Sequence, residues 1–335
     1  MKLGCNSNLY AELPFSAALE KLQDYGFTSL TFGIGGLEHL PEDHCNAEVL
    51  LEDKAAFREF EGTISKYGFS PNSIGCQSNP LHPRKEIAAR DDHDLRLSVL
   101  MAERLGMDRI NVFSGCPGGG PDAKYPNWVA YNWPRDFSAM LQWQWNESLI
   151  PYWKDFVKFA KQHGVDKIGM EFHPNWLVYN TDTLLRLREA VGPEIGVCLD
   201  PSHLFWMGMD PVVVIDKLSD CIFQVHGKDT MLIDHKIKEN GVIETHDTTD
   251  LANRAYSFGI PGDGHDLQVW KGIVRALLRA GYDRDICFEH EDCYMDREEG
   301  IARGVAFLKQ ALIDSERDNM FWKMRVGAKK YPYLD

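Results

Sequence analysis

Short apolar runs recur along the chain, and longer segments with helical spacing lie between them. The eight runs cover residues 2–5, 29–32, 73–76, 109–113, 168–172, 195–199, 221–225 and 285–288. Runs of this length, bounded by polar residues, are typical of buried strands. The intervening segments with helical spacing are 14–25, 52–67, 92–106, 148–163, 181–190, 211–218, 267–280 and 297–314. The pattern therefore predicts eight strand–helix units in order.

Several of the expected helices carry start signals. Asp210 precedes Pro211, Asp296 begins the capping-box sequence "DREE", and Asp266 lies just before the segment that starts at Leu267. Aspartate is a favoured helix N-cap, and proline is favoured at the first helical position. These signals support the assignment of the periodic segments to helices.

Eight consecutive strand–helix units predict an α/β fold of the (β/α)8 type, a TIM barrel. A doubly wound open sheet is the main alternative. It would usually carry a glycine-rich turn after its first strand, but that turn is "NSNLYAEL", and the later "FGIGGLEHL" lacks the GxGxxG spacing. We expect one catalytic domain over 1–315 and a C-terminal extension over 316–335.

Two connections are long, at 114–147 after the fourth expected strand and 227–266 after the seventh. In a barrel both lie on the C-terminal face, where active sites are built, and loops of this length are usually lids or partner surfaces.

The composition of the chain disfavours several classes of function. The chain has a formal net charge of -14, which disfavours nucleic acid as a partner because phosphate contacts need a basic surface. It has no apolar stretch long enough for a membrane span and no apolar signal region at its start. Its eight cysteines form no CxxC pair, so we expect buried thiols in a reducing, cytoplasmic compartment.

Polar side chains collect where the last four expected strands end. The strand ends contain "MEFHP", "LDPSHLF", "QVHGKD" and "FEHED". Residues two apart on a strand share a face, so Glu171 points the same way as His173, and Glu289 the same way as Glu291. A lone aspartate after a strand is more often a cap or a turn residue, but four adjacent strands would present Glu, Asp, His and Glu around one axis. This oxygen-rich set suits Mn²⁺, Mg²⁺ or Co²⁺ better than a structural zinc.

These four motifs, on eight strand–helix units, resemble the xylose isomerase-like superfamily of sugar phosphate isomerases and epimerases. That superfamily includes ketose 3-epimerases, inosose dehydratases and endonuclease IV. The resemblance implies one divalent ion, with Mn²⁺ first and Mg²⁺, Co²⁺ or Zn²⁺ as alternatives. The implied ligands are Glu171, Asp200, His226 and Glu289, and His203 is implied to contact a substrate oxygen.

The resemblance also implies proton abstraction next to a carbonyl, with Glu171 and Glu289 exchanging protons on opposite faces of a keto-sugar or polyol. The chain departs from the ketose 3-epimerases at two substrate-binding positions, which are Leu177 and Leu232 here. His173 is an additional acid/base candidate, because imidazole exchanges protons near neutral pH. We therefore expect an isomerase or epimerase, with a lyase (a dehydratase or a deglycosidase of 3-keto-sugars) as the alternative.

The segment "PGDGHD" at the end of the second long loop contributes Asp263 and His265 as substrate-binding candidates. An Asp-x-His pair here resembles endonuclease IV, where it binds additional zinc, but "NVFSG" lacks the histidine that this nuclease needs. The alternative without a functional role is that this segment forms a tight turn before the helix that Asp266 caps.

Other candidate contacts to a sugar are the indoles of Trp128 and Trp206 and the ammonium group of Lys228. Indole faces cover the C–H faces of pyranoses, although core packing explains a single tryptophan equally well. The aromatic and basic tail suggests a docking surface, so a homo-oligomer or a partner subunit is expected beside the small-molecule substrate.

Overall fold

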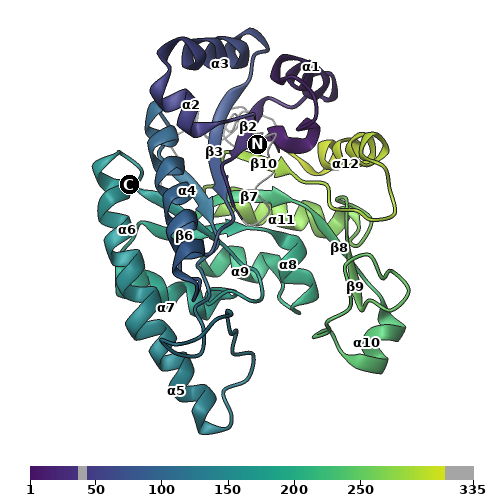
Figure 1. The fold of residues 1–335 in the computed structure, drawn as a ribbon. Coiled ribbons are helices and arrows are strands. Elements are labelled where there is room, and N and C mark those ends of the chain that lie inside the picture. The colour runs from purple at the N-terminus through teal and green to yellow at the C-terminus, as the bar shows by residue number, and fades with distance from the viewer. Residues whose placement is uncertain (37–43, 314–335) are drawn as a thin grey trace, which may run out of the picture.

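The computed structural model describes residues 1–36 and 44–313, so the extension expected at 316–335 lies outside the described residues. Eight parallel strands form a closed barrel in the order β1-β10-β7-β6-β5-β4-β3-β2 (Figure 1). They are β1 (Lys2–Asn6), β2 (Ser29–Gly33), β3 (Ser70–Cys76), β4 (Arg109–Val112), β5 (Lys167–Glu171), β6 (Ile195–Leu199), β7 (Ile222–Gly227) and β10 (Asp285–Phe288). Each predicted apolar run is a barrel strand, and the predicted TIM barrel is confirmed.

Eight of the helices follow the predicted segments and surround the barrel (Figure 1). They are α1 (Phe15–Tyr25), α3 (Lys54–Lys66), α4 (Lys85–Arg104), α6 (Ile150–Gln162), α7 (Thr181–Val191), α9 (Pro211–Lys217), α11 (Leu267–Arg279) and α12 (Arg297–Ala311). The predicted caps are present: Asp210, Asp266 and Asp296 each accept a hydrogen bond from a first-turn backbone N–H. Within the described ranges, no helix is both long and apolar enough to cross a bilayer.

Strand register aligns the polar strand ends. Glu171 is level with Cys198, two residues before Asp200, and His226 is level with Cys287, two residues before Glu289. Parallel strands in register bring their carboxyl ends to one rim of the barrel. Polar residues that follow different strands therefore converge there.

The long connections contain structure that the apolar pattern did not predict. The connection after β4 holds α5 (Arg135–Trp143) and a π-helical turn, η2 (Gln144–Leu149). The connection after β7 forms an antiparallel hairpin and a short helix, namely β8 (Asp229–Leu232), α10 (Asp234–Asn240) and β9 (Tyr256–Gly259). In the view of Figure 1, α5 lies at the bottom and α10 at the lower right. Three further short elements are η1 (Ser7–Tyr10), α2 (Ala47–Glu52) and α8 (Pro201–Trp206).

Candidate metal centre and active site

Four strand ends bring Glu171, Asp200, His226 and Glu289 together, as the sequence predicts. Glu171 is the last residue of β5, Asp200 follows β6, His226 lies on β7, and Glu289 follows β10. One potential ligand atom from each residue lies within 4.8 Å of the others. This is the geometry of a group that can surround a single ion.

His226 is central to this group. Its Nδ1 lies 3.3 Å from Glu289 Oε1, 3.5 Å from Glu171 Oε1 and 3.9 Å from Asp200 Oδ2. Glu171, Asp200 and His226 are buried, while the Glu289 side chain retains 21% of its exposure. The group is thus accessible mainly on the side of Glu289.

The donor set fits a divalent cation. Asp200 Oδ2 and His226 Nδ1 are buried and make no hydrogen bond, although buried polar atoms in folded proteins are normally satisfied. The opposite atoms are engaged: Asp200 Oδ1 accepts from Ser202 N at 2.8 Å, and His226 Nε2 lies 3.3 Å from Cys198 Sγ. These bonds orient Asp200 Oδ2 and His226 Nδ1 toward the centre of the group, as groups behind the ligands do in metal sites.

The carboxylates of the group differ in proton affinity. Burial raises the pKa of Glu171, but His226, His203 and Lys228 outweigh it and hold the pKa well below its ordinary value. The pKa of Asp200 is also lowered against burial, by Lys228 and the two histidines. Burial raises the pKa of Glu289 despite His226 and Lys228. Groups whose surroundings separate their pKa values can take different roles in proton transfer.

Lys228, which the sequence predicts to contact substrate, lies among carboxylates of the candidate site. Its buried ammonium group lies 3.1 Å from Asp200 Oδ2 and donates to Glu289 Oε2 at 3.0 Å and to Glu291 Oε1 at 2.9 Å. It also lies 5.1 Å from the ring centre of Phe258. The charge of Lys228 is therefore used to compensate protein carboxylates.

His203 and His173 lie beside Glu171. His203 Nε2 is 3.6 Å from Glu171 Oε1 and 3.5 Å from Asp200 Oδ2, and the His173 ring centre is 4.5 Å from that of His203. The Nδ1 of His173 lies 2.6 Å from the carbonyl oxygen of Pro174, which makes Nδ1 the donor and leaves Nε2 as the basic nitrogen. Burial, together with His203, lowers the pKa of His173 to about 4. His173 is therefore neutral near pH 7.

Aromatic side chains extend from His173. Phe113 lies 5.3 Å from the His173 ring and stacks on Trp176 at 4.8 Å, and the predicted Trp128 packs on the same cluster. The predicted Trp206 stacks on Tyr256 at 4.4 Å. The indole Nε1 atoms of Trp176 and Trp206 are buried and make no hydrogen bond. They are potential donors to a bound hydroxyl group.

Asp263 and His265 do not join the four-residue group. Asp263 is largely exposed. The partial burial of its carboxyl group, together with Asp292, raises its pKa. His265 donates from Nδ1 to Asp229 Oδ1 at 2.7 Å and stacks on Phe205 at 3.5 Å. Among the described residues, the groups with metal-ligand geometry are the four-residue group and its overlap with Cys198, so this loop forms no additional zinc site there.

Sequence reasoning missed several residues of this region. Gln77, which follows β3, donates to Glu171 Oε2 at 3.3 Å, and the same strand-end rule applied to β3 would have identified it. Buried Asp229 accepts from Gly262 N, from His265 N and from Trp270 Nε1. It thus ties the end of the second long connection to β8, through contacts that no local pattern reveals.

The comparisons with known proteins agree with this architecture. A family model described as "Xylose isomerase-like TIM barrel" matches residues 19–311. The Bacillus subtilis (strain 168) protein YfiH, described as uncharacterized, is 39% identical over 315 residues, which cover 93% of this chain and 99% of YfiH. An inosose dehydratase of Clostridium tetani (strain Massachusetts / E88) is 29% identical over 147 residues, 42% of this chain and 47% of that enzyme.

Solved structures show the same fold. The structure of an L-ribulose 3-epimerase aligns with a TM-score of 0.59 at 16% identity, covering 98% of this chain and 99% of that one. The structure of IOLI protein with a bound zinc atom aligns with a TM-score of 0.62 at 16% identity, covering 93% and 98%. At this level of identity the likeness concerns the fold.

Proposed function

Because the chain belongs to the xylose isomerase-like TIM barrel family, we propose that it is a divalent-metal-dependent isomerase or epimerase of a keto-sugar or polyol. In this proposal it removes and returns a proton next to a carbonyl group. The observation that carries the proposal is the placement of Glu171 and Glu289, whose Oε1 atoms lie 3.5 and 3.3 Å from His226 Nδ1 and come from strands separated by β6 and β7.

We assign Glu171, Asp200, His226 and Glu289 as the ligands of one ion, with Mn²⁺ as the first candidate. When bound, a divalent ion acts as a Lewis acid that polarises a substrate carbonyl and acidifies the neighbouring C–H. Asp200 Oδ2 and His226 Nδ1, which are buried without a hydrogen bond, support this assignment.

The protein side chains would then move the proton. Glu171 is held ionised by His226 and His203, which suits a base, whereas the raised pKa of Glu289 suits the group that carries the proton. Gln77 and Lys228 fix the second oxygen of each glutamate, which orients the two carboxylates. His203 faces the same centre and would contact a substrate oxygen.

A lyase reaction is the second candidate, and His173 favours it. A neutral imidazole with an unprotonated Nε2 can take up a proton and pass it to a leaving oxygen. The match to an inosose dehydratase over 147 residues points to the same class of reaction. An elimination would begin with the same proton abstraction.

The test is a panel of free ketoses, inososes and 3-keto-glycosides, incubated with protein and added Mn²⁺ in D₂O and analysed by mass spectrometry. An isomerase or epimerase would return substrate or isomer carrying deuterium without another mass change. A dehydratase would release water, and a deglycosidase would release the aglycone. If no member of a broad panel acquired deuterium or changed, the proton-abstraction proposal would be rejected.

Glu289→Gln should abolish deuterium exchange and metal retention, because it removes one charged ligand and one proton-transfer group. The matched control is Glu103→Gln, an exposed glutamate on α4 that contacts His163. Exchange at the wild-type rate in Glu289→Gln would exclude this site.

A further inference from the structure

A second cavity lies at the opposite end of the barrel from the four-residue group. It has a volume of about 270 Å³ and is lined at the starts of β4, β5 and β7 and by the turn before β10. Lys167, on its wall, begins β5, and Glu171 ends it, so the two sites are separated by the strand length of about 13 Å. Nothing in the proposed reaction uses this cavity.

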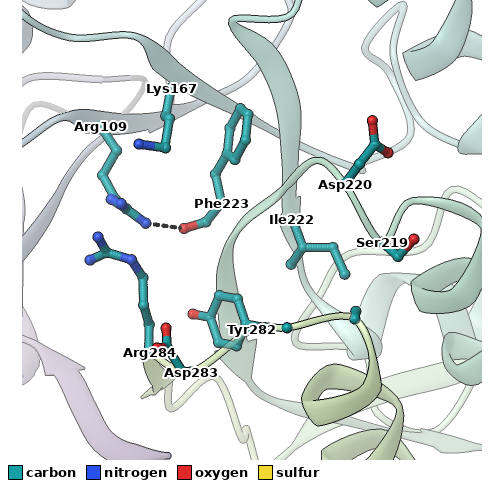
Figure 2. A pocket seen from close by; sticks show the side chains of 11 residues that line it. Arg109, Lys167, Ser219, Asp220, Ile222, Phe223, Tyr282, Asp283 and Arg284 are labelled. Carbon is teal, nitrogen blue, oxygen red and sulfur yellow. Dashed lines mark hydrogen bonds between the residues drawn. The ribbon is translucent and has the colours of Figure 1, made fainter. Parts of the chain in front are cut away.

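Three cationic side chains line this cavity: Arg109, Lys167 and Arg284 (Figure 2). In Figure 2 the guanidinium groups of Arg109 and Arg284 lie close together, with Lys167 near them. Cations placed this close repel one another unless anions intervene. Consistently, burial and then Arg284 lower the pKa of Arg109.

All three cations share one carboxylate, that of Asp108. Arg109 donates to Asp108 Oδ1 from Nε at 2.8 Å and from Nη2 at 2.7 Å, and Lys167 donates to Oδ2. The Arg284 guanidinium is only within 3.9 Å of Asp108, and its hydrogen bond goes to the neutral amide of Asn72 at 3.3 Å. The Asp108 carboxylate therefore faces three positive charges at short range.

Arg109 is fixed in place. It is 3% exposed, and its Nη1 donates to the carbonyl oxygen of Phe223 at 2.8 Å, the bond drawn in Figure 2. A guanidinium group has five N–H donors, and the bonds to Asp108 and Phe223 account for three of them. A buried, oriented arginine with donors to spare is the usual basis of oxyanion recognition.

The other acidic groups nearby are engaged or exposed. Asp220 lines the far side of the cavity and pairs with Arg188 at 3.3 Å. Asp283 is exposed to solvent, and Asp166, 62% exposed, lies 3.4 Å from Lys167. Solvent screens exposed charges far more than it screens a buried guanidinium.

We propose that this cavity binds a small phosphate-type dianion between Arg109, Arg284 and Lys167. The three cations face Asp108 at short range, while Asp166 and Asp283 are exposed, Asp220 pairs with Arg188, and buried Asp285 accepts from Ser29 Oγ at 2.6 Å. Phosphate near pH 7 carries about -1.5 to -2 with several acceptor oxygens, which suits the remaining donors of Arg109 and Arg284. Of the three cationic side chains, Arg284 can change its conformation to reach the ligand, because it is 41% exposed.

The test is thermal unfolding of the full chain in increasing inorganic phosphate, at constant ionic strength maintained with NaCl. A ligand that binds only the folded state raises the unfolding temperature, and above its dissociation constant the rise grows with the logarithm of the ligand concentration. We expect a rise with phosphate that becomes logarithmic in its concentration, a similar rise with sulfate and none with acetate, which carries a single charge. Arg284→Met should weaken the phosphate response about tenfold, because it removes a charge-assisted bidentate donor.

Two controls separate this cavity from other sites. Arg279→Met removes an exposed arginine that pairs with Asp216 and does not line the cavity, so it should respond to phosphate as the wild type does. Glu289→Gln should also respond fully, which separates the result from the metal-centre proposal. An equal response of wild type and Arg284→Met, or no response beyond that of NaCl, would overturn the proposal.

Discussion

The two carboxylate oxygens of Asp200 have different surroundings, and we propose different roles for them. Its Oδ1 caps α8 through Ser202 N, while its Oδ2 faces the centre of the candidate site without a hydrogen bond. Asparagine keeps a capping oxygen and loses the charge. We therefore expect Asp200→Asn to lose metal retention by about 10-fold or more while unfolding near the wild-type temperature.

Asp200→Ala loses both roles and should cost about 1 kcal/mol more in unfolding free energy than Asp200→Asn. Metal content and urea unfolding measured on both variants provide the check. Full metal retention in Asp200→Asn would show that the carboxylate serves only as a cap.

His173 provides a pH-dependent prediction. Burial and His203 lower its pKa from 6.5 to about 4, so its ring should titrate near pH 4 in the folded protein. A histidine that resists protonation when folded takes up its proton more readily when unfolded, so this group costs stability as the pH falls below 6.5.

An NMR titration of the His173 ring, assigned by comparison with His173→Gln, measures this pKa directly. A midpoint near 6.5 would remove the basis for treating His173 as a neutral imidazole at pH 7. His173→Gln should also lose less stability than the wild type between pH 6.5 and pH 4.

The residues that sequence reasoning placed well are those whose position follows from strand ends alone. Glu171, Asp200, His226 and Glu289 each end or follow a barrel strand, so topology brings them together. Lys228 also follows from a strand end, but its partners Asp200 and Glu291 come from neighbouring strand ends and take up its charge. The strand pattern predicts where a residue lies, but it does not predict which side chains will pair with it and thereby determine its role.

At the scale of elements, one carboxylate on α12 joins this helix to η1 and α1. Glu298, on α12, accepts from Tyr10 and Tyr25 through Oε2 and from Lys21 through Oε1, at 2.9, 2.6 and 2.8 Å. Hydrogen bonds from Lys21 and the two tyrosines lower the pKa of Glu298 to about 2. This network contributes stability above pH 4.5 and loses it as the pH falls toward 2.

Glu298→Gln should therefore destabilise the fold at neutral pH by about 1 kcal/mol. The value is small because the Lys21–Glu298 ion pair is half exposed and screened by solvent. The difference from the wild type should narrow as the pH falls below 4.5. Urea unfolding of both proteins at neutral and acidic pH measures it, and a difference independent of pH would exclude the ionic contribution.

The barrel strands and main helices were predictable because each carries its own periodic pattern and cap. β8 and β9 were not, because each has four residues and they pair across more than twenty intervening positions. α8 is a six-residue helix whose residues are all buried, so it shows no amphipathic alternation.

At the scale of the whole molecule, α5 has no buried residue, and the connection around it exposes Tyr125, Tyr131 and Trp133 by 76%, 72% and 69%. Such a patch is suited to association, so the expected homo-oligomer remains a prediction with a defined surface.

The candidate metal centre links four strands of the barrel, so its ion should affect the stability of the entire fold. Glu171, Asp200 and Glu289 converge on one buried point, and Lys228 is the lysine that compensates them among the described residues. A bound divalent ion would relieve this repulsion, and an ion present at about 1,000 times its dissociation constant adds about 4 kcal/mol to the unfolding free energy. Chelation should therefore lower the unfolding temperature by several degrees, and added Mn²⁺ should restore it.

Glu289→Gln should respond much less to chelator and to Mn²⁺, whereas Glu103→Gln on the outer helix α4 should behave as the wild type does. Differential scanning fluorimetry with metal analysis of the same samples measures both quantities. An unfolding temperature that chelation leaves unchanged, in protein shown to contain the ion beforehand, would mean that the four strand ends are held by Lys228 and their other protein partners without help from the metal.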